Sequence, residues 1–460
     1  MNVEQGMMKN EQRESASIPS AAPLSAAGRW LVLVTALLGW TFAGVQMALT
    51  TLVMRSAMVD LLDSTDEKIV GQWSAWLVGA FLLGAAAGGL LFGWIGDRFG
   101  RSRAMGLSIL WFSLSCGACY WVESPLQLVV LRALVGLGIG GTWPNGVALV
   151  SEAWSNASRP MLAGMMGAAG NVGLGAMAAI GMWIDIKPAN WEWTMLVGAL
   201  PVVLALLVFV LVPESPRWLA SRATDAGGEN GSGTFCRNGP AGASHKRFLT
   251  PFPQSPAVEV FRPPLLGITV VGILLGAVPL IGGWGSANWL VPWAEQVGSQ
   301  AEVPDYSLKA AVQFWRSVTS IIGSLLGGWL ASQVGRRRCY FLISLGSLLT
   351  AQYLFRSVIP GDGQFMVLVA ALGLFNGLYF GWLPLFLPEL FPTHVRSTGA
   401  GVSYNFGRIL AVVTVFASGW LIRHFGHDYA QIGTLTSFIF AVGLVVILFA
   451  PDTAGKQLED

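Results

Sequence analysis

Charged residues are scarce in this sequence: only 11% of its 460 residues are Asp, Glu, Lys or Arg, and a soluble protein carries about twice that share. Cysteine and histidine are scarcer still, with four of each. Cys116 and Cys119 lie one helical turn apart in an apolar stretch without a second ligand pair, so we interpret them as buried and inert. Without a phosphate-binding loop or a metal-ligand cluster, neither a pump nor a membrane enzyme is indicated, and we expect no cofactor.

What the chain does contain is a series of long apolar runs, each of a length that crosses ~30 Å of hydrocarbon. Because lipid offers the backbone no hydrogen-bond partners, each run is expected to be a helix. The fold class is therefore an all-α membrane protein with twelve transmembrane helices. The expected spans are 31–53, 73–95, 104–122, 126–150, 161–184, 194–212, 265–290, 311–334, 339–358, 365–388, 398–422 and 430–450.

The polar segments define the domain organisation. Residues 1–29 form a polar tail without a signal-peptide core, 213–264 a linker rich in Gly, Ser and Pro, and 451–460 a second tail. These segments separate bundles of six helices at 30–212 and 265–450. With both termini in the cytoplasm most Lys and Arg residues lie on the cytoplasmic side, as the positive-inside rule requires. We expect a multi-pass protein of the cell membrane, and the net charge of +2 gives no reason to expect nucleic acid.

The two bundles repeat one design at a shift of about 235 to 238 residues. "GDRFGRSR" at 96–103 aligns with "ASQVGRRR" at 331–338. An acid and a base seven residues apart after the fourth span recur after the tenth, as Glu152 with Arg159 and Glu389 with Arg396. Two repeated six-helix halves, with a binding site between them at mid-membrane, are typical of secondary transporters.

The turn "GWIGDRFGRSR" at 93–103 resembles the signature loop of the major facilitator superfamily. "PESPR", "PELFPTHVRSTGAG" and "PDTAGKQLED" resemble the sugar-porter and metabolite-symporter branches of that family, which carry organic acids and sialic acid-like solutes. The resemblance implies two six-helix bundles that rock about a central cavity. It also implies a transporter working by alternating access, and we expect it to be a monomer.

The repeated charges predict a gate at the cytoplasmic ends of the helices. We expect the arginines of the first loop to pair with Glu152, and Arg336 and Arg337 to pair with Glu389, in a latch that forms when these ends close. The alternative is that the arginines only satisfy the positive-inside rule. The expected gate residues are Asp97, Arg98, Arg101, Arg103, Glu152, Arg159, Arg217, Arg336, Arg337, Glu389 and Arg396.

Three arginines fall within expected spans: Arg132, Arg316 and Arg408. Charged groups inside a membrane are costly and mark functional sites by default. The expected spans hold no acid near their middle, so either carbonyls and water or an anionic substrate must compensate these arginines. Proton symporters of the resembling branches carry an acid in the first span, where this chain has Gln46, which speaks against proton coupling through that carboxylate.

The equivalence of Asn171 and Arg408 in the repeat predicts that both face the central cavity. Arg408 is suited to clamp a carboxylate, and the amides to read hydroxyl groups. The expected substrate-binding residues are Gln46, Arg132, Trp143, Asn145, Asn171, Trp284, Asn288, Gln313, Arg316, Asn376, Tyr379, Asn405 and Arg408.

The predicted solute is a small organic anion or sugar acid, moved by a facilitator or exchanger. A neutral sugar is the second candidate, although the glutamine-rich signature of sugar porters is missing from the seventh span. A transporter-like sensor that binds without transport is the third, and the short tail after the last span disfavours it. A drug exporter is disfavoured by the sugar-porter-like motifs.

Overall fold

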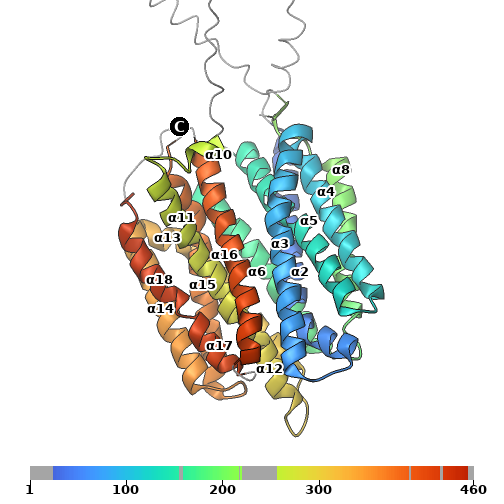
Figure 1. Cartoon of the computed structure of the whole chain (residues 1–460). Coiled ribbons are helices and arrows are strands. Elements are labelled where there is room, and N and C mark those ends of the chain that lie inside the picture. Colours follow the sequence, from blue (N-terminus) through green and yellow to red (C-terminus); the bar gives the residue numbers. More distant parts are fainter. Residues whose placement is uncertain are drawn as a thin grey trace, which may run out of the picture.

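The computed structural model describes residues 24–154, 159–216, 218–219, 256–392, 395–424 and 428–453. Over these ranges the chain is almost wholly helical and contains no β-strand, which confirms the all-α class. Figure 1 shows the helices side by side as one bundle, with the C-terminal helices on the left and the N-terminal helices on the right.

The N-terminal half holds the first six spans, and Pro201 divides the sixth into α7 and α8. Its helices are α2 (Ala26–Leu62), α3 (Glu67–Phe99), α4 (Arg101–Ala118), α5 (Pro125–Ala153), α6 (Arg159–Trp183), α7 (Trp193–Ala199) and α8 (Val202–Leu211). We call the end that holds the start of α2 the upper end, and the end that holds the α2–α3 turn the lower end, as drawn in Figure 1.

The C-terminal half holds the other six spans, and its first span is broken. This span runs through α11 (Leu266–Ile281), a π-turn η2 (Gly282–Ser286), a 3-10 turn η3 (Ala287–Trp289) and α12 (Leu290–Ser299). The remaining helices are α10 (Pro256–Glu259), α13 (Ser307–Val334), α14 (Arg336–Ser357), α15 (Gly363–Glu389), α16 (Arg396–His424), α17 (Tyr429–Thr436) and α18 (Ile439–Val446).

Ten helical segments of the described chain are long and apolar enough to cross a membrane. The two expected spans missing from that set are α13 and α14, which are 28 and 22 residues long. They lie in the same bundle as the others (Figure 1). Their lower hydropathy follows from the polar side chains of α13 and the basic start of α14.

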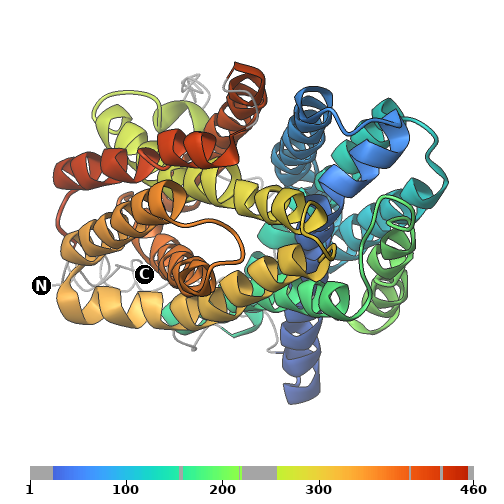
Figure 2. The same ribbon diagram turned by 90° about the horizontal axis from the view of Figure 1, so that it is seen from below.

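Two pairs of helices make the most extensive contacts between the halves: α6 packs along α13, and α3 packs along α16. Figure 2, seen from below, shows α12 in yellow reaching the blue α2 between the halves. Close approach within a half depends on small residues. A Cβ at Gly44 of α2, for example, would lie 2.0 Å from the carbonyl oxygen of Gly170 in α6.

The first expected span was too short. Its helix α2 continues to Leu62, nine residues beyond the expected end at residue 53. Arg55 therefore lies in a buried helical turn and not in an outer loop. The start of α13 likewise includes the buried Lys309. Both cations have buried acidic partners, described below.

Candidate functional site

Arg132 of α5 is bound within the N-terminal half through both terminal nitrogens of its guanidinium, whereas its Nε has no hydrogen-bond partner among the described residues. It is 2% exposed, and it donates to the side-chain oxygen of Gln46 at 3.1 Å, to the Gln46 carbonyl at 2.7 Å and to the Thr50 hydroxyl. Gln46 in turn donates to the Gly198 carbonyl at 2.6 Å, and the Phe81 ring lies 5.3 Å from the guanidinium. Neutral oxygens therefore compensate this buried charge. One of them belongs to Gln46, which occupies the position where proton symporters of the resembling branches carry an acid.

Arg316 of α13 binds the break in the neighbouring span. Its guanidinium donates to the Ala287 carbonyl at 2.7 Å, to Asn288 Oδ1 at 2.9 Å and to Gln313 Oε1 at 2.8 Å. A π-turn followed by a 3-10 turn interrupts the regular ladder of helical hydrogen bonds and leaves carbonyls available. Arg316 thus stabilises the irregular backbone of η3.

Arg408 of α16 differs from the other two arginines. Among the residues that the structure describes, it has no hydrogen-bond acceptor and no ion-pair partner, and its guanidinium lies 4.8 Å from the centre of the Tyr404 ring. Tyr404 and Arg408 lie on the side of the helix opposite the exposed Phe406, Val413 and Trp420. The charge of Arg408 therefore faces the inside of the protein without a counter-charge from this part of the chain.

Aromatic and amide groups surround this region. Trp284, Phe380 and Tyr404 pack against one small apolar cluster of the C-terminal half, and Trp284 lies 5.9 Å from Phe81 of the N-terminal half. Asn376 Oδ1 lies 3.6 Å from the position that a Cβ on Gly283 would take. Aromatic rings from both halves thus meet next to an arginine and an amide.

Further amides and an indole from the expected set lie at or near the contact between the halves. Asn171 of α6 donates to the Ser324 hydroxyl of α13 at 3.4 Å. Asn405 Oδ1 of α16 lies 3.7 Å from the place of a Cβ on Gly89 of α3. Trp143 packs on Trp40 at 4.6 Å within the N-terminal half.

Two expected binding residues lie inside one half and are removed from the candidate set. Tyr379 is fully buried, and its hydroxyl is hydrogen-bonded to Ser344 at 2.7 Å. Asn145 is 1% exposed and donates to the Phe92 and Gly141 carbonyls at 3.0 and 2.9 Å. The Tyr379 hydroxyl and the Asn145 amide nitrogen thus bind partners of their own half and stabilise helix packing, whereas Asn145 Oδ1 has no hydrogen-bond partner among the described residues.

At the upper end of the C-terminal half, Arg336 binds Glu389 through two hydrogen bonds of 3.2 and 3.0 Å. Thr453 donates to the same carboxylate at 2.6 Å. Arg337, also expected to pair with Glu389, donates to the Leu448 carbonyl at 2.6 Å instead. One of the two expected pairings is therefore present.

At the upper end of the N-terminal half, the pairing differs from the expectation. Arg101 forms an ion pair with Asp97 at 2.6 Å, one turn earlier in the chain, and Glu152 accepts from the Ser215 hydroxyl. Arg98 lies over the Trp94 ring at 5.6 Å. A helix-to-helix turn at this point brings Asp97 nearer to Arg101 than Glu152 is.

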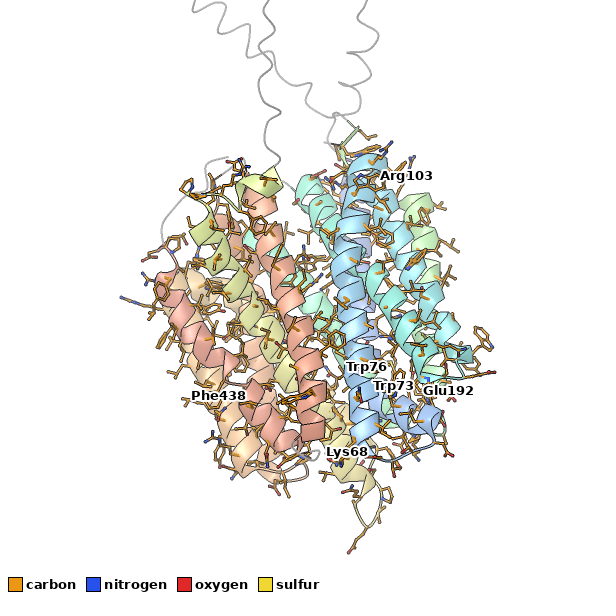
Figure 3. All side chains as sticks on the ribbon, in the orientation of Figure 1. Lys68, Trp73, Trp76, Arg103, Glu192 and Phe438 are labelled. Atoms are coloured by element: carbon orange, nitrogen blue, oxygen red, sulfur yellow. The ribbon has the colours of Figure 1, made fainter. Side chains whose placement is uncertain are left out.

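The remaining expected gate residues form no described ion pair with Glu152 or Glu389. Figure 3 shows Arg103 at the upper end of the N-terminal half. Arg217 and the side chains of Arg159 and Arg396 lie outside the described residues. Glu214 was missed: it accepts from the Ser102 amide at 3.0 Å, at the positive end of α4. Its place in the "PESPR" motif was the available signal.

The lower end holds buried charges that the sequence reading assigned to loops. We call them the lower-end cluster, and each of its members is at most 9% exposed. The members are Arg55, Ser56, Glu67, Glu295, Lys309 and Tyr429.

Glu295 of α12 is the centre of this cluster. It accepts from Ser56 at 2.8 Å and from Arg55 at 3.4 Å, both on α2, and pairs with Lys309 of α13 at 2.9 Å. Lys309 also donates to the Ser56 hydroxyl at 2.7 Å. The carboxylate therefore binds one cation from each half.

Glu67 of α3 is the second acid of the cluster. It accepts from Arg55 Nε at 3.0 Å and from the Tyr429 hydroxyl of α17 at 3.1 Å.

Within the described residues, no group of three or more His, Cys, Asp or Glu side chains is placed to hold a metal ion.

The profile of the family described as "Sugar (and other) transporter" matches residues 31–460. The chain belongs to this family. It is therefore a multi-pass membrane transporter of small-molecule solutes with the major facilitator fold, and not an enzyme. The broad function expected from the motifs is confirmed.

Relatives of this transporter carry several kinds of solute. The chain is 26% identical over 387 residues to a probable 4-methylmuconolactone transporter of Cupriavidus pinatubonensis, covering 82% of each protein. It is 27% identical to the cis,cis-muconate transport protein of Acinetobacter baylyi, covering 75% of this chain and 78% of that protein. The gallate transporter of Pseudomonas putida is also 27% identical, with 84% of each chain covered.

Among solved structures, the fold is similar to that of a D-xylose-proton symporter. The TM-score is 0.68 at 17% identity, and the match covers 93% of this chain and 99% of the symporter. At this identity the likeness shows the fold alone.

Proposed function

We propose that the protein transports a small organic anion across the cell membrane by alternating access, with both termini in the cytoplasm. The upper end then faces the cytoplasm and the lower end the outside. Arg408 binds the carboxylate of the solute, and Asn376, Asn171 and Trp284 contact its remaining groups.

The observation that carries this proposal is the difference between the three intramembrane arginines. Arg132 and Arg316 are each surrounded by oxygen acceptors from their own half. Among the described residues, Arg408 has the Tyr404 ring beside its guanidinium and neither a hydrogen-bond acceptor nor an ion-pair partner. A guanidinium within a membrane needs compensation, and a carboxylate that binds both of its N–H edges supplies it with two charge-assisted hydrogen bonds.

The relatives support an organic acid. Muconate and gallate, named for two of them, are both organic acids: muconate carries two carboxylates, and gallate carries one carboxylate and three hydroxyl groups on an aromatic ring. Each offers a carboxylate to Arg408, and the tryptophan, tyrosine and asparagine side chains suit the apolar and hydroxyl groups of an acid such as gallate.

We propose further that the first span takes no part in proton coupling. Gln46 is an amide and cannot carry a proton on and off at physiological pH. Its oxygen and nitrogen are both bound, to Arg132 and to the Gly198 carbonyl. This arrangement favours facilitated diffusion or anion exchange.

Thermal unfolding of the purified full-length protein tests the solute class, because a ligand that binds the folded state raises its stability. The probes are cis,cis-muconate, gallate, glucuronate and neutral glucose, on the wild type, Arg408→Gln and Arg408→Lys. We expect the acids to stabilise the wild type, and Arg408→Gln to weaken their binding by about 10- to 100-fold. Arg408→Lys keeps the charge but loses the planar fork, so we expect an intermediate loss.

The matched control is Arg356→Gln, which removes an exposed arginine on α14 away from this region. It is expected to bind the acids as the wild type does. If glucose but none of the acids stabilises the wild type, and stabilises Arg408→Gln to the same extent, the neutral-sugar alternative is favoured. Arg408 then has a structural role. Uptake of the stabilising solute into proteoliposomes then separates transport from binding without transport.

A further inference from the structure

The lower-end cluster joins the two halves of the transporter. We infer that it is an ionic lock that closes the lower end and can open without leaving a charge unpaired in either half. The inference goes beyond the proposed solute and does not depend on it.

The contacts across the halves involve both acids and Lys309, which donates to the Ser56 hydroxyl of the N-terminal half at 2.7 Å. Glu295 of the C-terminal half accepts from Ser56 at 2.8 Å and from Arg55 at 3.4 Å. Glu67 of the N-terminal half accepts from Tyr429 at 3.1 Å. Because all of these groups are buried, water does not screen the contacts, and they hold α2 and α3 against α12 and α17.

Each half also contains its own neutral pair. Arg55 pairs with Glu67 within the N-terminal half, with an Nε···Oε1 distance of 3.0 Å. Lys309 pairs with Glu295 within the C-terminal half at 2.9 Å. When the halves separate at this end, both pairs stay intact, and only the contacts across the halves are exchanged for water.

This division of charge matters because a buried ion without its partner is strongly destabilising, whereas a pair that stays together is not. A lock made of one cation on one half and one anion on the other would leave both ions unpaired on opening. The observed four-charge arrangement avoids that cost, as a reversible conformational change requires.

The four charges come from corresponding helices of the two halves. Arg55 lies near the end of the first span and Glu295 near the end of the seventh, while Glu67 begins α3 and Lys309 lies in the first turn of α13. The order of the signs is reversed between the halves, so that Arg55 of one half faces an acid of the other.

The test measures the separation of the halves at the lower end in the full-length protein in lipid. Spin labels are placed on Thr65→Cys in the α2–α3 turn and Ala301→Cys in the α12–α13 loop, both exposed sites. The labels are introduced after the native cysteines are replaced by alanine. Pulsed electron spin resonance then gives the populations of short and long label distances, without any added solute.

Charge swaps within one half are the decisive variants. Glu295→Lys with Lys309→Glu keeps a neutral pair in the C-terminal half but sets Lys at 295 against Arg55. Arg55→Glu with Glu67→Arg does the same in the N-terminal half. We expect either swap to increase the ratio of the long-distance to the short-distance population at least tenfold, and both swaps together to restore the wild-type ratio.

A second set of variants leaves every charge in place, so the inference remains testable if a swapped protein fails to fold. Ser56→Ala with Tyr429→Phe removes hydrogen bonds across the halves, and the ratio is expected to rise about tenfold. The matched control is Ser113→Ala with Tyr340→Phe, whose hydroxyls bond carbonyls of their own half. Unchanged distances in Ser56→Ala with Tyr429→Phe, or in well-folded charge swaps, would overturn the lock.

Discussion

The two ends of the bundle use charge in different ways. At the upper end the ion pairs and hydrogen bonds described above join residues of the same half, as Arg336 with Glu389 and Arg101 with Asp97. At the lower end Arg55 and Ser56 of one half bind Glu295 of the other. Polar contacts across the halves therefore fasten the lower end, while the upper-end pairs described above stabilise their own half.

The acids of the two ends also differ in burial, with Glu389 of the upper end nearly as buried as Glu295 of the lower end. The carboxylate side chain of Asp97 is 67% exposed, that of Glu389 is 5% exposed, and that of Glu295 is 1% exposed. The free energy contributed by an ion pair rises as water is excluded and as its loss leaves a buried partner. The comparison predicts a graded series of effects when each acid is neutralised.

The largest effect is expected for Glu295→Gln. It leaves the buried Lys309 without an acid, since the other acid of the cluster is engaged by Arg55. We expect a loss of about 3–5 kcal/mol in folding stability, seen as a large drop in the thermal unfolding temperature in detergent. Glu302→Gln, in the exposed loop after α12, is the control and should behave as the wild type.

Glu389→Gln is expected to have a smaller effect. Arg336 keeps its hydrogen bond to the Ala331 carbonyl at 2.8 Å, its side chain is 15% exposed, and the amide still offers one acceptor. A loss of about 1–2 kcal/mol is expected in the same assay. A destabilisation equal to that of Glu295→Gln would contradict the proposed difference between the ends.

Asp97→Asn is expected to have the smallest effect on stability. It removes a partly exposed pair across the turn between α3 and α4, and such pairs contribute about 0.2–1 kcal/mol. The unfolding temperature should change little, and raising the salt concentration should remove the remaining difference from the wild type. A drop of several degrees that salt leaves unchanged would show that Asp97 has a further buried partner.

The sequence predicted the fold well because apolar length and the repeated motifs report directly on spans and halves. It predicted the location of the intramembrane arginines for the same reason. It did not predict which face of an apolar helix points inward, so that Tyr379 and Asn145 were assigned to the binding region. In helices that are apolar on all sides, one polar residue gives no direction until its neighbours are known.

The lower-end cluster was missed for a different reason. Arg55 and Lys309 stand near the ends of apolar runs, where charged residues usually mark the start of a loop. Their acidic partners lie 12 residues away for Arg55 and on the preceding helix for Lys309. Only the packing of α2 and α3 against α12 and α13 brings these charges together.

The bond between Arg316 and the broken span has a mechanical consequence. Arg316 ties α13 to the Ala287 carbonyl at the break, while Lys309, two turns away on the same helix, ties α13 to Glu295 on α12. The Asp305 amide donates to the Gly298 carbonyl and closes the loop between these helices at 2.9 Å. The helices α12 and α13 are thus held together at three levels. We expect them to move as one rigid unit, so that a displacement at the break is transmitted to the lower end of the transporter.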